Sequence, residues 1–387
     1  MPFPPAWKIR REILRVCVKV GLATARWIYE PVRKIVYDRT ALKRQRLTKG
    51  AFPLTDRVAV FVVFQPRGVP ASVHFTVDHL RQNGFSVLVV SNGQLRLEDR
   101  ATLAERASLV LERPNVGYDF GGYRDGIRYL WSLNHSLSRL VLMNDSTWFP
   151  LRSSDDSLAR MEALGADLAG HIYKIEDEAD RYQDHVESHL LMISRDFFNS
   201  EEFRRFWTDY RMSDFRSTTI GYGEKGFTQM ALRSCRDVAT LMSREWLLST
   251  LRGLDEVHVR TVLDHTIDTF KGSQKDASDV RRALAQRERW RETFLDWVER
   301  ALSNSRSFLI SATFIMPALV YGGMGFAKKA RDLRFHLARK KLLDLEERGM
   351  ISPIDSVVRH EIIAAVRSWQ PPSDWKTNPH EASKAEQ

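Results

Sequence analysis

Three short segments of the sequence hold most of the side chains that could do chemistry. The first runs from Arg113 to Gly126 and reads RPNVGYDFGGYRDG. Its glycines would let the backbone approach a ligand closely, and the helix that begins here offers free N–H groups to an anion. Asn115 and Asp119 could hold a nucleobase or a ribose. The alternative is a glycine-rich strand-to-helix turn whose Asp residues only cap the helix.

The other two segments are each built on one carboxylate. Asp145 follows a hydrophobic strand in the sequence NDS. It could hold a divalent cation against a diphosphate, although an Asp at a strand end is also a common turn residue. Glu224 opens an apolar-periodic helix that continues to Leu232. It could be a general base for a hydroxyl proton, or simply a favourable partner of the helix dipole.

The elements that must position these segments alternate between strands and helices. Strands are predicted at 58–64, 86–90, 108–111, 139–143, 166–173 and 188–194, and helices at 71–83, 97–107, 118–133 and 155–164. This alternation predicts an α/β fold with a doubly wound, mostly parallel sheet flanked by helices. Ligands of such folds bind at the carboxyl ends of the strands, where Asn92, Asn115 and Asn144 fall.

The pattern divides the chain into four parts. Residues 1–50 read as a basic amphipathic helix, expected from about Trp7 to Val36 with Pro31 as its kink or end, followed by a basic linker. Residues 51–250 form the sheet domain, 251–370 a helical region and 371–387 a disordered tail. The cations of the N-terminal helix predict a peripheral contact with anionic lipid, and the alternative is a helix packed on the protein's own core.

Two later segments also bear on membranes. Residues 307–327 carry no charge and are long enough to span a bilayer. They are predicted either as a transmembrane helix or as a buried or membrane-lying helical element. Residues 328–348 are strongly basic and could lie against anionic headgroups.

The composition fits a globular protein with an anionic partner. The 387 residues are 43% hydrophobic and 28% charged, and the formal net charge is +10. The two cysteines form neither a disulfide framework nor a zinc motif, which fits a reducing cytosol. No secretory signal is expected, because lysines and arginines interrupt the N-terminal apolar residues. The sequence has no P-loop, and no aromatic-basic or recognition-helix pattern, so nucleic-acid binding is not predicted.

Taken in order, the three segments resemble the nucleotide-binding layout of GT-A glycosyltransferases. More closely, the run from Asn115 to Gly126 followed by LMNDS at 142–146 resembles the rhamnan synthesis protein F family. Residues 90–92, 185–195 and 223–229 fit that family too, and the resemblance covers about residues 57–236. It implies a GT-A-like, Rossmann-like fold. It also implies transfer of a sugar, L-rhamnose in the named case, from a nucleotide-diphosphate donor to a growing glycan.

The resemblance implies roles for particular residues. The donor would lie against Asn92, Asn115, Gly117, Asp119, Asn144, Asp145 and Ser146. Asp145 would also hold Mg²⁺ or Mn²⁺, but a single acid stands where GT-A enzymes carry a paired Asp-x-Asp, so the sequence leaves the metal requirement open. Glu224, or alternatively Asp119 or Asp125, would deprotonate the acceptor. His189 would lie on the acceptor side or have a structural role.

The sequence therefore predicts a glycosyltransferase of bacterial surface-polysaccharide synthesis. The donor would be a nucleotide sugar, and the acceptor a polysaccharide or lipid-linked glycan such as O-antigen, rhamnan or capsule. The basic N-terminus predicts a cytoplasmic protein, peripheral on the inner face of the cytoplasmic membrane. The alternative is a non-catalytic glycan-binding or scaffold protein at the membrane surface that keeps a GT-A-like domain.

Overall fold

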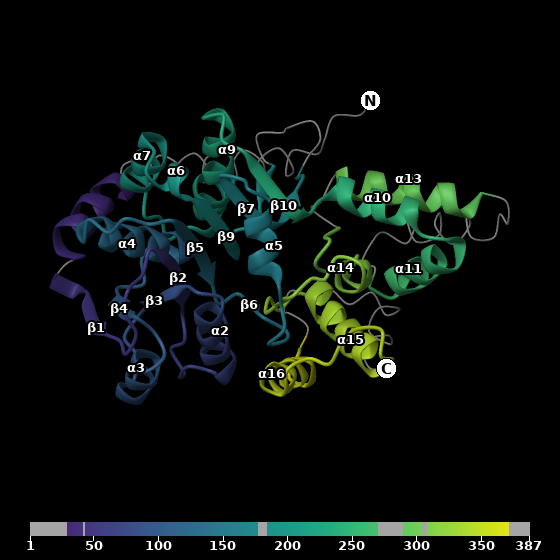
Figure 1. The fold of residues 1–387 in the computed structure, drawn as a ribbon, viewed down its shortest axis with the longest axis horizontal. Coiled ribbons are helices and arrows are strands. Elements are labelled where there is room, and N and C mark those ends of the chain that lie inside the picture. Colours follow the sequence, from purple (N-terminus) through teal and green to yellow (C-terminus); the bar gives the residue numbers. More distant parts are fainter. Residues whose placement is uncertain (1–28, 42, 177–183, 270–288, 304–307, 371–387) are drawn as a thin grey trace, which may run out of the picture.

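A nine-stranded sheet forms the centre of the molecule (Figure 1). The computed structural model describes residues 29–41, 43–176, 184–269, 289–303 and 308–370. The strand order is β1-β4-β3-β2-β5-β9-β7-β10, with β8 paired to β7. The strands of this sheet are β1 (Arg46–Lys49), β2 (Arg57–Val63), β3 (Ser86–Asn92), β4 (Leu109–Arg113), β5 (Arg139–Asn144), β7 (Leu168–Lys174), β8 (His185–Val186), β9 (Leu190–Ser194) and β10 (Val238–Met242).

Most strands of this sheet point in one direction. β2 is parallel to β3 and β5, β3 is parallel to β4, and β7 is parallel to β10. β1, β8 and β9 run antiparallel to their neighbours, and β9 lies between β5 and β7, so β7 again points the same way as β5. The predicted α/β fold with a mostly parallel sheet is therefore confirmed.

Helices cover both faces of the sheet. They are α2 (Ala71–Gln82), α3 (Leu97–Ala104), α4 (Tyr118–Ser132), α5 (Ser157–Ala163), α6 (Arg195–Phe198), α7 (Glu201–Asp209), α8 (Arg216–Thr218) and α9 (Gly226–Arg233), with a π-helical segment, η2 (Thr219–Lys225), before α9. The side chains of β2 alternate between the two layers. Phe61 faces the core with α2, α3 and α5, whereas Val60 and Val62 face the core with α4, α7 and α9. Burial on both faces explains why β2 reads as an unbroken apolar run.

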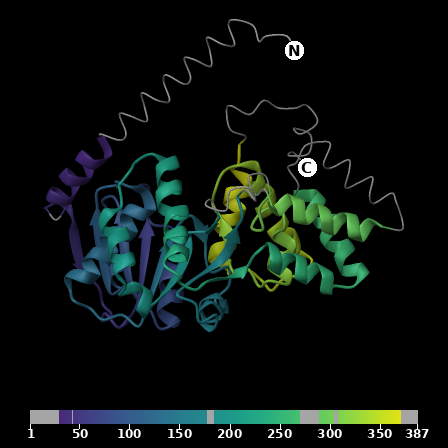
Figure 2. The same cartoon turned by 90° about the horizontal axis from the view of Figure 1, so that it is seen from above.

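A C-terminal group of helices continues one of these layers (Figures 1 and 2). Its helices are α10 (Arg244–Gly253), α11 (Glu256–Thr269), α13 (Trp290–Ser303), α14 (Ile315–Val320), α15 (Leu333–Glu347) and α16 (Ser356–Arg367). The strand β11 (Ala327–Lys328) pairs antiparallel with β6 (Thr147–Trp148), directly after β5. α16 packs on α2, where Ser72 donates hydrogen bonds to Glu361. One hydrophobic core thus extends from the sheet into the C-terminal helices.

The described part of the N-terminal helix covers residues 29–41 and docks through a tyrosine. Tyr37 and Ala41 are buried in the core beside α4, and the Tyr37 hydroxyl donates a hydrogen bond to Asp125. The helix continues past Pro31 to residue 41, so of the two predicted roles, kink or end, Pro31 does not end the helix. Residues 7–28 of the predicted helix lie outside the described residues.

The predicted basic linker needs correction, because it ends in the edge strand β1. The predicted sheet domain 51–250 also contains the strand β10, which the sequence did not indicate. Both strands are too short for periodicity to reveal, and their pairing with β4 and β7 is what defines them. In the segment 307–327, α14 has six residues and is mostly buried, which agrees with the predicted buried helical element and not with a transmembrane helix. Across the described parts of the chain, no helix is long and apolar enough to cross a membrane.

Glycines allow α4 to lie directly on the sheet. A Cβ atom added at Gly122 would lie 2.7 Å from Val62 Cγ1, and one added at Gly126 would lie 2.6 Å from Val60 Cγ1. Both distances are shorter than atoms tolerate. These two glycines of the first chemical segment therefore serve close packing of helix and strand.

We expect Gly126→Ala to lower the free energy of unfolding by about 1–3 kcal/mol, because the new methyl group overpacks the contact with Val60. Urea denaturation measures this change. Gly253→Ala at the end of α10 is the control, since nothing lies within 4 Å of its added Cβ. An equal effect of the two substitutions would contradict the packing argument.

Candidate active site

The candidate site lies where the strand order reverses. From β2 the chain adds β3 and β4 on one side of the sheet, and β5 lies on the other side of β2. Ligands of doubly wound sheets bind outside the carboxyl ends of strands at such a point. Asp145 follows β5, and its Oδ2 accepts hydrogen bonds from the backbone N–H of Phe64 at 2.9 Å and from Gln65 Nε2 at 2.7 Å. Asp145 thus joins the carboxyl ends of β5 and β2, and its position directly after β5 is the one predicted.

The neighbours of Asp145 shape the turn. Asn144 Oδ1 accepts hydrogen bonds from the N–H and the hydroxyl of Ser146, which is a side-chain-stabilised turn. Asn144 Nδ2 donates to Asp119 Oδ2 at 3.1 Å. Asn144 is buried, whereas Ser146 is exposed. Asn144 and Ser146 were both predicted to contact the donor. Of these two, Ser146 is accessible to a ligand, whereas Asn144 orients Asp119.

Asp119 stands in the first turn of α4. The backbone just before it is strained, because two successive residues have positive φ. Gly117 has φ 80° and Tyr118 has φ 51°, an unusual value for a residue with a side chain. Burial, together with the negative charges of Asp145 and Glu224, raises the pKa of Asp119 to about 7. Three carboxylates from α4, the β5 end and η2 therefore face one region.

Glu224 lies in the π-helical segment η2, two residues before α9 begins, and not in the first turn of an α-helix. Its Oε1 accepts hydrogen bonds from the Ser188 N–H at 3.0 Å and the Ser188 hydroxyl at 2.9 Å. Burial alone would raise its pKa, but His185, Ser188 and Lys328 outweigh burial and lower it. Glu224 stays ionised at neutral pH, whereas Asp119 exchanges its proton there, and such a separation of pKa values is typical of acid–base sites.

Asp125 belongs to a buried ion pair away from this cluster. Arg113 Nε lies 2.6 Å from Asp125 Oδ2, and the exposed fractions of the two side chains are 0% and 3%. Tyr37 and Gln45 donate to the same Asp125 oxygen, and Arg113 also donates to Asn92 Oδ1. Through Arg113, Asp125 and Asn92 therefore hold α4, β3 and β4 together, and both side chains are buried.

His189 is also part of an internal network. It is 2% exposed, its Nδ1 lies 3.1 Å from Lys328 Nζ, and its Nε2 lies 3.0 Å from His171 Nδ1. An ammonium can only donate, so His189 Nδ1 accepts and Nε2 carries the proton toward His171. Burial and the charge of Lys328 lower the pKa of His189 well below its usual value. Both ring nitrogens are occupied, so the geometry places His189 behind the site as a support for Lys328.

Two residues at the mouth of the site remain accessible. Asn115 is exposed, as a donor-binding residue must be. Tyr118, which sequence reasoning passed over, is 44% exposed at the same turn, and its backbone carbonyl is held by Asn92 Nδ2. An exposed aromatic ring on a strained turn at a sheet edge is suited to stacking on a planar ligand. The signal in the sequence was the aromatic residue directly after Gly117.

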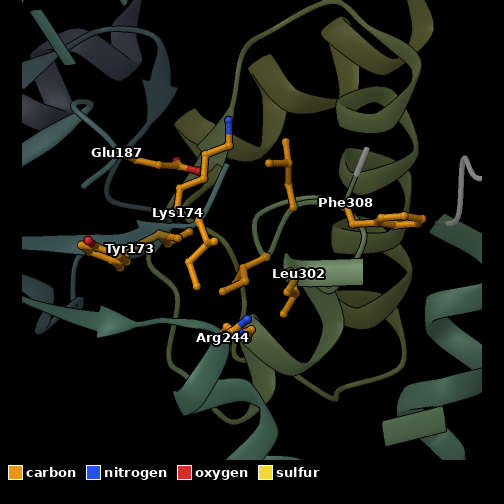
Figure 3. A pocket seen from close by; sticks show the side chains of 10 residues that line it. Tyr173, Lys174, Glu187, Arg244, Leu302 and Phe308 are labelled. Carbon is orange, nitrogen blue, oxygen red and sulfur yellow. The ribbon is translucent and has the colours of Figure 1, made fainter. Parts of the chain in front are cut away.

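A small pocket opens between the end of β7 and the C-terminal helices (Figure 3). Tyr173, Lys174 and Glu187 line it from the sheet side, and Leu302 and Phe308 line it from the helical side. Glu187 forms an ion pair of 2.9 Å with Lys328, whose charge also acts on Glu224. Lys328 therefore interacts both with a residue that lines the pocket and with Glu224.

The fit of a divalent cation depends on Asp145. Within the described ranges, no group of three His, Cys, Asp or Glu side chains is arranged to hold a metal ion. Asp145 Oδ2 is occupied by two hydrogen bonds, which leaves Oδ1. Mg²⁺ often binds through one or two carboxylates together with substrate phosphates and water. The residues present thus fit a cation that arrives with a diphosphate.

Comparison with known proteins agrees with this geometry. The model of the rhamnan synthesis protein F family matches residues 87–235, and this confirms the predicted resemblance. The matched stretch contains Asp119, Asp145 and Glu224, and it supports a role in rhamnan-type polysaccharide synthesis. The chain is also 29% identical over 364 residues to an uncharacterized protein, y4gN, of Sinorhizobium fredii (strain NBRC 101917 / NGR234), across 92% of this chain and 91% of that protein. This second similarity includes most of the C-terminal helical region.

Asp119→Asn should stabilise the fold more at pH 8 than at pH 5. The carboxyl binds its proton more tightly in the folded chain, with a pKa of about 7, than in the unfolded chain, with a pKa of about 3.9. Its ionisation therefore costs stability increasingly as the pH rises from about 4 to 7, and fully above that. We expect a gain of about 1–3 kcal/mol at pH 8, since solvent screens part of the shift.

Thermal melts of both proteins at the two pH values measure this difference. Asp209→Asn, at an exposed carboxylate at the end of α7, is the control and should give the same small effect at both. A gain at Asp119 that does not depend on pH would contradict the raised pKa.

Proposed function

We propose that this chain is a glycosyltransferase that moves a sugar from a nucleotide-diphosphate donor to a growing bacterial surface polysaccharide. The observation that carries the proposal is the convergence of Asp119, Asp145 and Glu224 at the reversal point of the sheet, within the stretch that the family model matches. Sugar transfer needs a base for the acceptor hydroxyl and neutralisation of a departing diphosphate. A carboxyl group that exchanges its proton near neutral pH suits the first task, and a carboxylate that can hold a divalent cation suits the second.

The donor would bind along the turn from Asn115 to Asp119 and at the β5 end. Tyr118 offers an exposed ring to the nucleobase, and Asn115 offers its amide. Asp145 and Ser146 would lie against the diphosphate, where a bound Mg²⁺ or Mn²⁺ would neutralise negative charge. L-Rhamnose is the sugar that the family resemblance favours.

The acceptor sugar would bind at the carboxyl edge of the sheet, next to Asp119. Its hydroxyl oxygen attacks the anomeric carbon of the donor, the bond from that carbon to the diphosphate oxygen breaks, and the bonding electrons leave with the diphosphate. The hydroxyl proton passes to the ionised form of Asp119, which is present in part at neutral pH because the pKa is about 7. We assign the base to Asp119 and not to Glu224, because the Asp119 pKa of about 7 is matched to neutral pH whereas that of Glu224 is lowered.

Thermal-shift measurements with nucleoside diphosphates and nucleotide sugars test the donor class, with Mg²⁺, Mn²⁺ or EDTA present. Binding at a hundred times the dissociation constant should stabilise the fold by about 2.7 kcal/mol. Stabilisation by one nucleotide family, and sugar transfer from its nucleotide sugar, would support the proposal. No stabilisation by any nucleotide at millimolar concentration would favour the non-catalytic glycan-binding alternative.

With the donor known, two variants test the base within the same assay. Asp119→Asn should lower kcat by about 10²–10⁴-fold. Glu224→Gln should instead shift the rise of kcat/KM to lower pH, because loss of a neighbouring negative charge lowers the pKa of Asp119. If Glu224→Gln abolished transfer at every pH while Asp119→Asn kept it, the base would be Glu224.

We also propose that the helix at 29–41 rests on an anionic membrane, which would hold the enzyme at the inner face of the cytoplasmic membrane. Tyr29, Val32, Ile35 and Val36 are each at least half exposed and lie on one helical face. The exposed cations Arg39, Lys43 and Arg44 accompany them. The buried face of the same helix is anchored through Tyr37, so the apolar stripe points away from the core.

Replacing Val32 and Val36 by Glu should weaken binding to anionic vesicles by at least about tenfold, because two apolar contacts are lost and two negative charges face the lipid. Vesicle co-sedimentation measures this change. The control replaces Leu97 and Val257, which are 74% and 73% exposed on α3 and α11, by Glu. An equal loss in both double variants would mean that net charge alone governs binding.

A further inference from the structure

A segment of the C-terminal region reaches the candidate active site. β11 pairs with β6, and Lys328 stands opposite Thr147 in the register. The next residue, Lys329, donates its backbone N–H to the carbonyl of Ser146 at 2.8 Å. Its backbone is therefore fixed one residue away from Asp145. About 180 residues separate Asp145 and Lys329 in the sequence, and no local sequence pattern indicates that they lie close together.

The two adjacent lysines have different surroundings. The ammonium group of Lys328 is engaged by Glu187 and His189. The ammonium of Lys329 is half-buried, lies 5.5 Å from the centroid of the Trp148 ring, and has no carboxylate within ion-pair distance among the described residues. Burial lowers the pKa of Lys329, and the charges of Asp145 and Glu361 oppose that shift. A half-buried cation without an ion pair costs stability unless a ligand supplies the missing negative charge.

A buried arginine holds the backbone on both sides of Lys329. Arg339 Nη1 donates to the carbonyl of Lys328 at 2.9 Å and to that of Ala330 at 2.8 Å. Arg339 is 2% exposed, lies 5.9 Å from the centroid of the same Trp148 ring, and its Nε finds no hydrogen-bond acceptor among the described residues. The guanidinium therefore fixes the position of Lys329 and adds a second positive charge beside it.

We propose that Lys329 binds the diphosphate of the donor and neutralises it as it leaves, with Arg339 as the positioning residue. This inference rests on the proposed function and assigns part of the site to a segment outside the stretch that the family model matches. An ammonium group is a compact point charge that suits phosphate oxygens. The backbone at Lys329 is fixed beside the turn that holds Asp145 before the donor arrives, so only the side chain must adjust when charge develops on the leaving group.

The chemistry of the site also favours a protein cation here. A diphosphate carries at least two negative charges, and Asp119, Asp145 and Glu224 add further negative charge to the same region. One cation bound through a single carboxylate would leave much of this charge uncompensated. Lys329 supplies positive charge without drawing on the carboxylate oxygens.

The experiment measures binding of inorganic pyrophosphate and of the nucleoside diphosphates by calorimetry, in EDTA, with the full-length chain. Lys329→Met should weaken pyrophosphate binding by at least about tenfold, the loss expected for one charge-assisted hydrogen bond. Lys329→Arg should keep most of the affinity. Lys49→Met, at an exposed lysine in the edge strand β1, changes the net charge equally and should leave binding unchanged.

The outcomes separate this inference from the proposed function. Lys329→Met could lose pyrophosphate binding while, in the wild type, no nucleoside diphosphate binds more tightly than pyrophosphate. That result would support the anion site and contradict the nucleotide donor. Unchanged pyrophosphate affinity in Lys329→Met would overturn the inference even if nucleotide sugars bind. If pyrophosphate bound only in Mg²⁺ and not in EDTA, the inference would also be overturned. Equal losses of pyrophosphate affinity in Lys329→Met and Lys49→Met would overturn it too.

The role of Arg339 is tested by a double-mutant cycle. Arg339→Gln should weaken pyrophosphate binding when Lys329 is present and should have little further effect in the Lys329→Met background. A purely structural role would lower affinity equally in both backgrounds.

Discussion

The buried guanidinium of Arg113 is the contact on which the candidate site depends. It stands at the end of β4 and joins Asp125 of α4, Asn92 at the end of β3 and the carbonyl of Val116. A buried charge of this kind is stable only when its partners are all in place. The same carboxylate of Asp125 also receives Tyr37, so the N-terminal helix is fixed by the same group. Because Arg113 and the glycines fix α4 on the sheet, Asp119 is held at the carboxyl edge.

The electrostatics of the site follow from this placement. Three carboxylates from separate elements face one region, and their repulsion together with burial leaves one of them, Asp119, with its proton near neutral pH. Glu224 stays ionised because Ser188, His185 and Lys328 outweigh its burial. The cations that balance this charge come from β11 and the residue after it. The carboxylates of the candidate site and the lysines that face them thus come from different parts of the fold.

The C-terminal helices are continuous with the sheet. They share its hydrophobic core, contribute β11 to the strand pair beside Asp145, and form one wall of the pocket next to β7. An ordinary hydrophobic interface therefore also positions charged residues. This arrangement explains how a similarity over 92% of the chain can extend beyond the segment that carries the recognised motifs.

The sequence by itself determined the α/β class, the six strands and four helices predicted between residues 58 and 194 to within a few residues, and the family resemblance. These features depend on burial with a fixed period and on short contiguous motifs, as in β2 and in the turn from Asn115 to Asp119. Only the tertiary structure decided that β9 runs antiparallel, that β1 and β10 are strands, that Asp125 and His189 lie in internal networks, and that Lys329 lies beside Asp145. Strand pairing, ion pairing and pKa shifts depend on distances through space between segments far apart in the chain, and no local pattern encodes those distances.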